Sequence, residues 1–405
     1  MSGKRCFVFL QGPLSPFFLR LGLAIRRRGH EAYKVNMCGG DVFHWPAPHT
    51  LHWRGRHEAW PHWVSGHMDS LEATDLILLG DWRPLHSEAV LLARQRGIRV
   101  WVFEEGYLRP NNLTLEEGGV NAASPLPRDA KGVRALAARL AHMRPETSSK
   151  ADNPMWLRVL MTAWNHVGNV LLWPLFHRYR THRPCCIGRE LIGWLPHWLM
   201  RKRRHADSQH VLRHFYRQKP PYYFMPLQLD SDSQIRRYSP FSGILESLAV
   251  VITDFAVHAP KDSFLLIKNH PLDNGLLNYR RYVRSLGAAT GCSDRLHFLE
   301  GVSTTRLINR CQGVVLCNST VGLSALQAGK AVYCLGDAVY AMPGLASSGR
   351  DMPLSRFWSE LPAPDAALLE DFLHVLRVAA LIPGNFYSCS GIDDAIAAAL
   401  RRMDA

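Results

Sequence analysis

The feature that most constrains the fold is a repeated order of apolar run, helix-forming segment and second apolar run. The first apolar run, 6–10, precedes a Gly/Pro turn, a segment with helical spacing over 16–28 and a second strand at 31–35. Residues 76–103 repeat the order strand, helix, strand. Uninterrupted apolar strands that alternate with helices are typical of a parallel sheet buried on both faces. We therefore predict a Rossmann-like domain over residues 1–125.

The same order returns in the second half of the chain. It predicts a second Rossmann-like domain over residues 216–385, and a length of 405 residues is enough for two or three domains. A final apolar-periodic stretch predicts a closing helix within 386–405. The strands predicted for the second domain are 222–225, 263–268, 313–316 and 331–335.

Residues 126–215 differ from both domains, because no alternating strands are evident and tryptophan and basic side chains cluster. The segment ends near the basic run 201–204. We predict a helical, basic and Trp-rich insert, for which two interpretations stay open. It is either a solvated basic face with a Trp-containing core, or a membrane contact in which Trp lies at the interface and the cations attract anionic headgroups. The tryptophans are Trp156, Trp164, Trp173, Trp194 and Trp198.

The charge balance limits the partners. Lys and Arg number 48 against 34 Asp and Glu, a net charge of +14, which favours anionic partners such as nucleotides or acidic lipids. No nucleic-acid-binding motif is evident, so we expect no nucleic-acid partner. Nine cysteines without a C-x-x-C pair indicate reduced thiols and a cytoplasmic location. No secretory signal and no apolar run of about 20 residues is evident, so the sequence predicts a protein that does not cross a membrane.

Two polar motifs follow strands of the first domain. Gln11-Gly12 follows the first strand but does not match the G-x-G-x-x-G signature of dinucleotide-binding proteins. Glu104 and Glu105 lie at the end of the strand that begins near 99, where ligands bind in open α/β sheets. One of these two carboxylates is a candidate acid, base or nucleophile, and the alternative is an ordinary solvated pair.

The first strand of the second domain leads into a polar run that contains Gln228, Asp230, Asp232 and Gln234. Two aspartates at i and i+2 could bind a metal, but no third ligand lies at a usual spacing, so we expect no metal site. A carboxylate that acts on substrate hydroxyls is the preferred interpretation. A helix cap by Asp232 or Ser233 is the alternative.

The strand 263–268 delivers Lys268 and, two residues later, His270 to its end. Both can donate to a phosphate, Lys as a point charge and His through a directed N–H group. A lone histidine in this place would more often be structural. The lysine beside it favours a phosphate site.

The strand 313–316 leads into the polar turn Asn318-Ser319-Thr320 and then a helical pattern over 321–328. Ser319 or Thr320 would cap that helix, and its free N–H groups would form an anion site. The structural cap and the phosphate site are compatible, since the same geometry serves both.

Together these motifs, in this order and spacing, resemble the capsular polysaccharide synthesis family of the KpsS/LipB type. The resemblance runs from the first strand to about residue 345 and includes Phe9 to Pro13 and Gly39-Gly40-Asp41 besides the motifs above. It implies a GT-B-like α/β enzyme, whose two Rossmann-type domains have parallel sheets that face each other across a cleft. It also implies transfer of Kdo from CMP-Kdo to a (lyso)phosphatidylglycerol acceptor, which starts the β-Kdo linker of Gram-negative capsular polysaccharide, with this member adding the first Kdo.

The resemblance assigns expected roles to the motif residues. A β-Kdo donor and a β-linked product imply retention, which permits double displacement through a carboxylate adduct. Asp232 is expected to be the nucleophile or sugar-orienting carboxylate and Glu105 the acid/base, with Glu104 and Asp230 as reserves. The expected donor side comprises Lys268, His270, Asn318, Ser319, Thr320, Gln228 and Gln234. The expected acceptor side comprises Gln11 and Gly12.

The implied reaction needs no cofactor, and we predict that it is independent of metal, because a CMP-sugar carries its own phosphate leaving group. The expected location is the cytoplasmic face of the inner membrane, as a peripheral protein and a candidate member of a capsule biosynthesis complex. Two alternatives stay open. The first is a glycosyltransferase with another nucleotide sugar, and the second is a non-catalytic scaffold for capsule assembly or export at the membrane.

Overall fold

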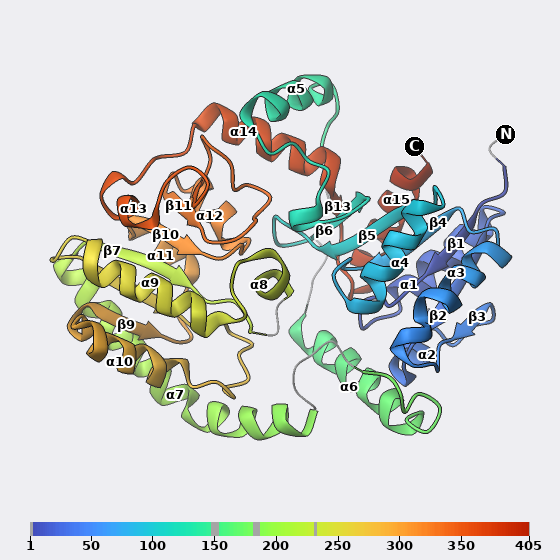
Figure 1. The fold of residues 1–405 in the computed structure, drawn as a ribbon, viewed down its shortest axis with the longest axis horizontal. Coiled ribbons are helices and arrows are strands. Elements are labelled where there is room, and N and C mark those ends of the chain that lie inside the picture. The colour runs from blue at the N-terminus through green and yellow to red at the C-terminus, as the bar shows by residue number, and fades with distance from the viewer. Residues whose placement is uncertain (1–2, 147–153, 181–186, 231–232, 405) are drawn as a thin grey trace. The chain divides into compact units, whose positions relative to one another are not determined.

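The computed structural model describes residues 3–146, 154–180, 187–230 and 233–404. The chain forms two compact units, each built around one sheet (Figure 1). Unit 1 comprises Met1–Pro125, Arg139–His182 and Leu373–Ala405. Unit 2 comprises Leu126–Ala138 and Arg183–Phe372.

The sheet of unit 1 has the strand order β13-β6-β5-β4-β1-β2-β3. The strands from β5 to β3 in this order are mutually parallel, whereas β6 is antiparallel to β5, and β13 is antiparallel to β6. The parallel strands are β1 (Cys6–Phe9), β2 (Glu31–Asn36), β3 (Thr50–His52), β4 (Asp75–Leu79) and β5 (Arg99–Glu105). The antiparallel strands are β6 (Asn112–Glu117) and β13 (Leu381–Pro383).

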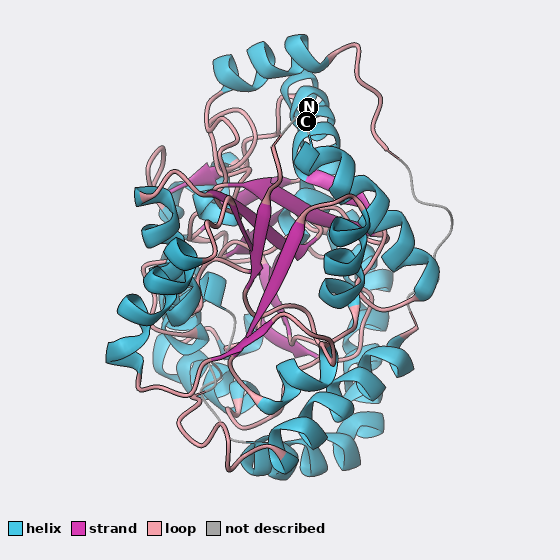
Figure 2. Cartoon of the chain, turned by 90° about the vertical axis from the view of Figure 1, so that its right-hand side faces the viewer, coloured by secondary structure: helices cyan, strands magenta, loops and turns pink. Residues whose placement is uncertain are grey.

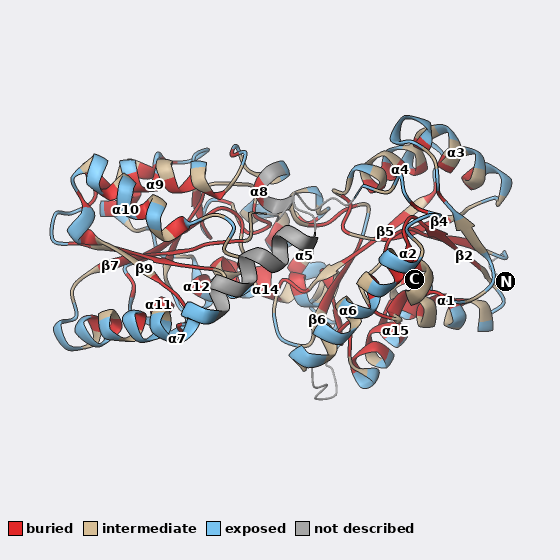
Figure 3. Ribbon diagram, turned by 90° about the horizontal axis from the view of Figure 1, so that it is seen from below, coloured by how far each residue is buried: buried red, intermediate tan, exposed pale blue. Residues whose placement is uncertain are grey.

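Helices cover both faces of this sheet, as the continuous burial of β1 requires. Phe7 and Phe9 belong to a core that includes residues of α1 (Phe17–Arg27) and α15 (Cys389–Asp404). Val8 belongs to the opposite core, with residues of α3 (Trp60–Ser70) and α4 (Pro84–Gln95). Successive side chains of a strand point to opposite faces, so an apolar run without polar alternation needs helices on both sides. The strands accordingly lie between layers of helices (Figures 2 and 3).

The sheet of unit 2 is parallel throughout, in the order β12-β11-β10-β7-β8-β9. Its strands are β7 (Tyr222–Pro226), β8 (Phe264–Lys268), β9 (Leu296–Leu299), β10 (Gly313–Leu316), β11 (Ala331–Cys334) and β12 (Ser347–Ser348). Its connecting helices are α8 (Ser233–Tyr238), α9 (Ile244–His258), α10 (Tyr279–Thr290), α11 (Thr304–Arg310), α12 (Val321–Gln327) and α13 (Leu354–Glu360). The predicted α/β class with two Rossmann-type sheets is confirmed, although the sheet of unit 1 is parallel only from β5 to β3 and carries two antiparallel strands at one edge.

The structure divides the ends of the predicted domains differently. The chain returns to unit 1 within the last turn of α14 (Ala366–Val375), and β13 then adds an edge strand before α15. Residues 373–385 therefore lie in unit 1, although the sequence placed them in the second domain. A three-residue antiparallel edge strand is too short to show a pattern of its own.

The predicted insert 126–215 is helical but does not form a separate body. It contains α5 (Ala130–Leu140), α6 (Met155–Leu171) and most of α7 (Ile187–Gln218). Helix α6 packs on α2 (Gly39–His44) in unit 1, and the end of α7 packs beside β9 in unit 2. The two helices thus bury side chains against the two units. Among the described residues, no helix is both long and apolar enough to cross a membrane.

Candidate functional site

Each sheet has one point where the strand order reverses direction. In unit 2 the chain runs outward from β7 through β8 to β9, and β10 then lies on the other side of β7. In unit 1 it runs from β1 to β3, and β4 then lies on the other side of β1. Ligands of open α/β sheets bind outside the carboxyl ends of the strands at such a point. The residues that follow β7 and β10, and those that follow β1 and β4, are therefore the candidates.

In unit 2, Gln228 and Asn318 form a reciprocal amide pair at this point. Gln228 Nε2 donates to Asn318 Oδ1 at 3.1 Å, and the Asn318 backbone N–H donates to Gln228 Oε1 at 3.3 Å. Both side chains are buried. The pair fixes the ends of β7 and β10 relative to each other, and it holds two predicted donor-side residues in one place.

The neighbouring strand β8 ends at Lys268, which is buried, and burial lowers the pKa of its ammonium group. Burial disfavours the charged form of an ammonium group, and a bound anion stabilises that charged form again. Two residues later, His270 Nδ1 accepts a hydrogen bond from the backbone N–H of Leu272 at 3.1 Å. A neutral ring with Nδ1 as acceptor carries its proton on Nε2, which makes His270 a hydrogen-bond donor.

The turn after β10 differs from the predicted anion site. Ser319 Oγ accepts from the backbone N–H of Val321 at 3.3 Å, whereas the side chain of Thr320, the N-cap residue of α12, makes no capping hydrogen bond. Helix α12 has only 7 residues, so its dipole adds little to anion binding. The phosphate-binding expectation for this unit therefore depends chiefly on Lys268 and His270.

The polar run after β7 is described only in part. Asp230 Oδ1 accepts from the backbone N–H of Ile244 at 3.1 Å, so this carboxylate serves the amino end of α9. A Cβ atom at Gly243 would lie 2.7 Å from that oxygen, which explains the glycine. Asp232 and the side chain of Gln234 lie outside the described residues.

In unit 1, Gln11 is the centre of a polar cluster at the switch point. Its Nε2 donates to Tyr179 Oη at 3.0 Å and to Asp41 Oδ2 at 3.3 Å. Its Oε1 accepts from Arg83 Nη1 at 3.1 Å. Asp41 Oδ2 also accepts from the backbone N–H of Met37 at 2.9 Å, so the turn after β2 is tied to the end of β1.

The cluster contains polar atoms that nothing in the described chain satisfies. Asn36, the last residue of β2, is fully buried, and neither its Nδ2 nor its Oδ1 has a partner among the described residues. Nε of Arg83 is likewise buried without a hydrogen-bond partner among the described residues. Lys34 donates to the Val35 carbonyl at 2.6 Å and lies 3.8 Å from Asp41, and burial lowers the pKa of its ammonium group. Buried polar groups are almost always paired, so atoms left unpaired next to a switch point indicate a place for a ligand.

The remaining predicted residues of unit 1 have visible contacts. Glu104 Oε1 accepts from the backbone N–H of Glu105 at 3.1 Å, and Glu105 Oε1 lies 3.3 Å from Arg158 Nη2 on α6. Gly12 has a packing reason, because a Cβ atom there would lie 2.4 Å from the ring of Phe18.

Four residues of these clusters escaped the sequence-based prediction: Lys34, Arg83, Tyr179 and Arg158. Arg83 follows β4 at the same switch point as Gln11, so the strand-end rule could have found it. Tyr179 and Arg158 reach unit 1 from the predicted insert, and their local sequence carries no signal of that contact.

The chain is similar to known proteins in sequence and in fold. A family model described as capsule polysaccharide biosynthesis protein matches residues 74–387. The chain is 32% identical over 392 residues to the capsule polysaccharide export protein KpsS of Escherichia coli, which covers 96% of this chain and 98% of that protein. It is 30% identical over 388 residues to the capsule polysaccharide modification protein LipB of Neisseria meningitidis serogroup A, covering 94% of this chain and 91% of that protein. Among solved structures, it is similar to the KpsC β-Kdo 2,7 transferase of Thermosulfurimonas dismutans, with a TM-score of 0.45, 16% identity and coverage of 98% and 100% of the two chains.

Proposed function

The chain belongs to the capsule polysaccharide biosynthesis protein family, and on this premise we propose that it is a retaining glycosyltransferase. The proposed reaction moves the first Kdo from CMP-Kdo to a (lyso)phosphatidylglycerol acceptor and so starts the β-Kdo linker of a capsular polysaccharide. The observation that carries the proposal is the arrangement of strand ends at the switch point of unit 2. The Gln228–Asn318 pair joins the ends of β7 and β10, and Lys268 and His270 lie at the end of β8, the strand next to β7.

The proposed donor site of unit 2 suits a nucleoside monophosphate. Lys268 supplies a positive charge, and the Nε2–H group of His270 supplies a directed donor. Both interactions strengthen as cytidylate leaves, because the departing phosphate gains negative charge. The amide pair would hold the adjoining strand ends in one arrangement while the nucleotide binds and leaves.

The proposed acceptor site of unit 1 suits an anionic headgroup with free hydroxyls. Arg83 offers a guanidinium group, and Asn36 offers an unpaired amide at the end of β2. Glu104 and Glu105 at the end of β5 are the carboxylates for proton transfer.

Retention follows from two displacements at the anomeric carbon of Kdo. A carboxylate oxygen, which we assign to Asp232, bonds to that carbon and the bond to cytidylate breaks. An acceptor hydroxyl, whose proton passes to Glu105, then attacks the same carbon and releases the Asp232 carboxylate. Glu104 and Asp230 are the reserves for these two roles. No step requires a metal, and we propose that the protein acts at the cytoplasmic face of the inner membrane.

The proposal is tested with purified protein, CMP-Kdo generated in situ and a fluorescent lysophosphatidylglycerol, with EDTA present during transfer. Mass spectrometry should detect a single added Kdo. Asp232→Asn and His270→Ala should abolish the product, and the exposed His142→Ala is the matched control that should retain it. Absence of product from folded wild-type protein, with metal restored and other nucleotide sugars tried, would overturn the transferase proposal and favour the scaffold.

A further inference from the structure

Helix α6 exposes a wide apolar side. On its inner side Asn165 and Gly168 are buried against α2, and Leu157 and Met161 pack, partly buried, against the core of unit 1. Its outer side chains are large, apolar and exposed, and they recur at the three- and four-residue spacing of one helix face. We call them the α6 apolar face: Trp156, Val159, Leu160, Val167, Val170 and Leu171.

The exposure on this face is high for side chains of this kind. Trp156 is 65% exposed and Val170 70% exposed, and the apolar side chains continue past the helix with Trp173 at 64%. A single exposed leucine is ordinary, but a continuous apolar face on one helix is typical of a surface that binds a membrane or another molecule. The blue outer side of α6 is visible in Figure 3.

The charged residues around the α6 apolar face indicate what kind of partner binds it. Residues 154–180 contain no Asp or Glu, and they contain Arg158, Arg178 and Arg180. Arg178 and Arg180 are exposed just beyond the apolar face. A helix with an apolar face, tryptophans and only basic charges has the composition of segments that lie in the interface of a membrane.

We propose that α6 lies in the plane of an anionic bilayer, with the α6 apolar face inserted among the headgroups and Arg178 and Arg180 at the anionic surface. Seventeen residues extend about 25 Å along the surface at 1.5 Å per residue. The bilayer is the single occupant that supplies both an apolar layer and a dense negative charge. This inference deepens the proposed function and rests on it for the identity of the acceptor, but membrane binding itself does not depend on transfer activity.

The inner face of α6 connects this surface to the candidate site of unit 1. Asn169 Oδ1 accepts from the backbone N–H of Gly40 at 2.8 Å, and Gly40 precedes Asp41 of the Gln11 cluster. A Cβ atom at Gly40 would lie 1.9 Å from Asn165 Oδ1, so α2 approaches α6 closely at this glycine. The bilayer would therefore meet a helix that directly positions the turn after β2.

Two further contacts come from the same segment. Arg158 Nη2 lies 3.3 Å from the Glu105 carboxylate, and Tyr179 Oη accepts from Gln11 Nε2 at 3.0 Å. The segment 155–179 thus carries the apolar face on one side and touches Glu105 and Gln11 on the other. This arrangement would bring a lipid acceptor to unit 1 without the headgroup leaving the bilayer surface.

The test is flotation of the full-length protein with vesicles of mixed phosphatidylglycerol and phosphatidylcholine, without any sugar donor. The double variant Trp156→Ser/Val170→Ser should bind these vesicles about tenfold more weakly or worse, since two large apolar side chains no longer enter the bilayer. Leu91→Ser/Val257→Ser is the matched control, because both side chains are similarly exposed on other helices, and it should bind as wild type. Equal unfolding midpoints for the three proteins exclude a folding defect.

Several outcomes would overturn the inference. One is wild-type protein that does not float, and another is a double variant that floats as well as wild type. A third is a dimer in lipid-free solution that the double variant abolishes, because the face would then be covered by a second copy. Transfer to a water-soluble, short-chain acceptor distinguishes this inference from the proposed function. If only the transferase proposal is wrong, the protein still binds vesicles but transfers no sugar. If only the membrane proposal is wrong, transfer to the soluble acceptor persists without vesicle binding.

Discussion

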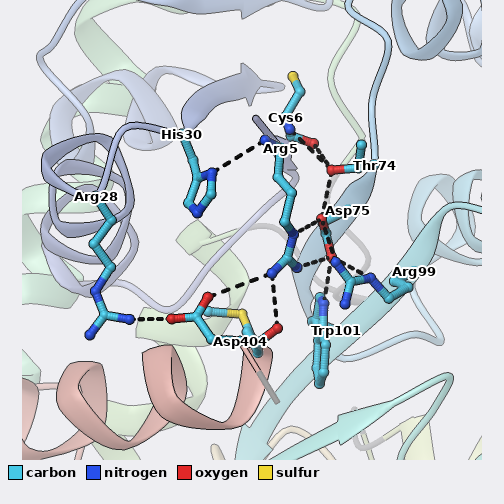
Figure 4. Close-up of polar contacts among 10 residues, drawn as sticks. Arg5, Cys6, Arg28, His30, Thr74, Asp75, Arg99, Trp101 and Asp404 are labelled. Atoms are coloured by element: carbon cyan, nitrogen blue, oxygen red, sulfur yellow. Dashed lines mark hydrogen bonds and ion pairs between the residues drawn. The ribbon is translucent and has the colours of Figure 1, made fainter. Parts of the chain in front are cut away.

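Buried polar groups at the two ends of the parallel strands of unit 1, which we call the amino edge and the carboxyl edge of the sheet, differ in their hydrogen bonding. At the amino edge, Asp75 is fully buried and every side-chain oxygen is paired, with Arg5 at 2.6 and 2.9 Å and Trp101 Nε1 at 2.9 Å (Figure 4). Arg99 and the Thr74 hydroxyl complete that cluster. At the carboxyl edge, Asn36 is as deeply buried, yet neither of its amide atoms has a partner among the described residues. A saturated cluster is complete without a ligand, whereas an unsaturated one has bonding capacity that a ligand could use.

The comparison predicts the largest loss of stability at the amino edge. Asp75→Ala leaves the guanidinium groups of Arg5 and Arg99 without their carboxylate, and breaking a buried ion pair in this way costs about 3–5 kcal/mol. Urea unfolding should show that decrease in the free energy of unfolding. Asp69→Ala removes an exposed carboxylate paired with Arg96 and should have little effect. A variant of Asp75 that unfolds like wild type would contradict the structural interpretation of this edge.

Unit 2 also contains a buried polar group that a ligand could pair, the ammonium group of Lys268. Lys268→Met removes a buried charge, so the protein should be as stable as wild type or more stable. It should bind CMP about 30- to 150-fold more weakly, the effect of losing about 2–3 kcal/mol from a charged hydrogen bond. Calorimetry with CMP measures the affinity, and the exposed Lys261→Met is the control. Unchanged CMP affinity would remove Lys268 from the donor site.

Sequence reasoning found most strand ends because the physics of those positions is local. An apolar run ends where polar residues begin, so the amino-acid pattern alone places Gln228, Lys268 and Asn318 at one edge of a parallel sheet. The reciprocal hydrogen bonds of Gln228 and Asn318 could not be predicted, because the two residues are 90 positions apart and their pairing depends on the strand order.

The less regular parts of the chain were harder to predict for a physical reason. The pattern of residues 126–215 indicates helices, but helical spacing does not reveal which face is covered. Helix α6 carries apolar residues on both sides, since Leu157 and Met161 pack on the core of unit 1 while Trp156 faces outward. Arg158 and Tyr179 were missed because long-range packing on α2 brings them to unit 1.

The third prediction has the opposite sign in stability from the first. Asn36→Leu replaces an unpaired buried amide by an apolar side chain of similar size, so the free energy of unfolding should rise by about 1 kcal/mol. Asn385→Leu is the matched control, since Asn385 is buried but its Oδ1 accepts from the backbone N–H groups of Tyr387 and Ser388. That control should be destabilised. For Asn36→Leu we also expect about a tenfold higher KM for the lipid acceptor, measured at saturating CMP-Kdo, and an unchanged KM would leave Asn36 outside the acceptor site.

The smallest effect is a pH dependence set by Lys268. Burial lowers the pKa of its ammonium group below the ordinary 10.5, so the unfolded chain binds more protons than the native protein between the lowered pKa and 10.5. The stability of the free protein should therefore rise with pH across that window, and the rise should be absent in Lys268→Met. CMP affinity should change in the opposite direction, because a neutral amine cannot pair with phosphate and binding weakens as pH rises through the same window. Calorimetry with CMP across the alkaline range measures this change, and the His270→Ala background removes the contribution of the histidine. A CMP affinity that stays constant across this range would show that the charged form of Lys268 does not bind the phosphate.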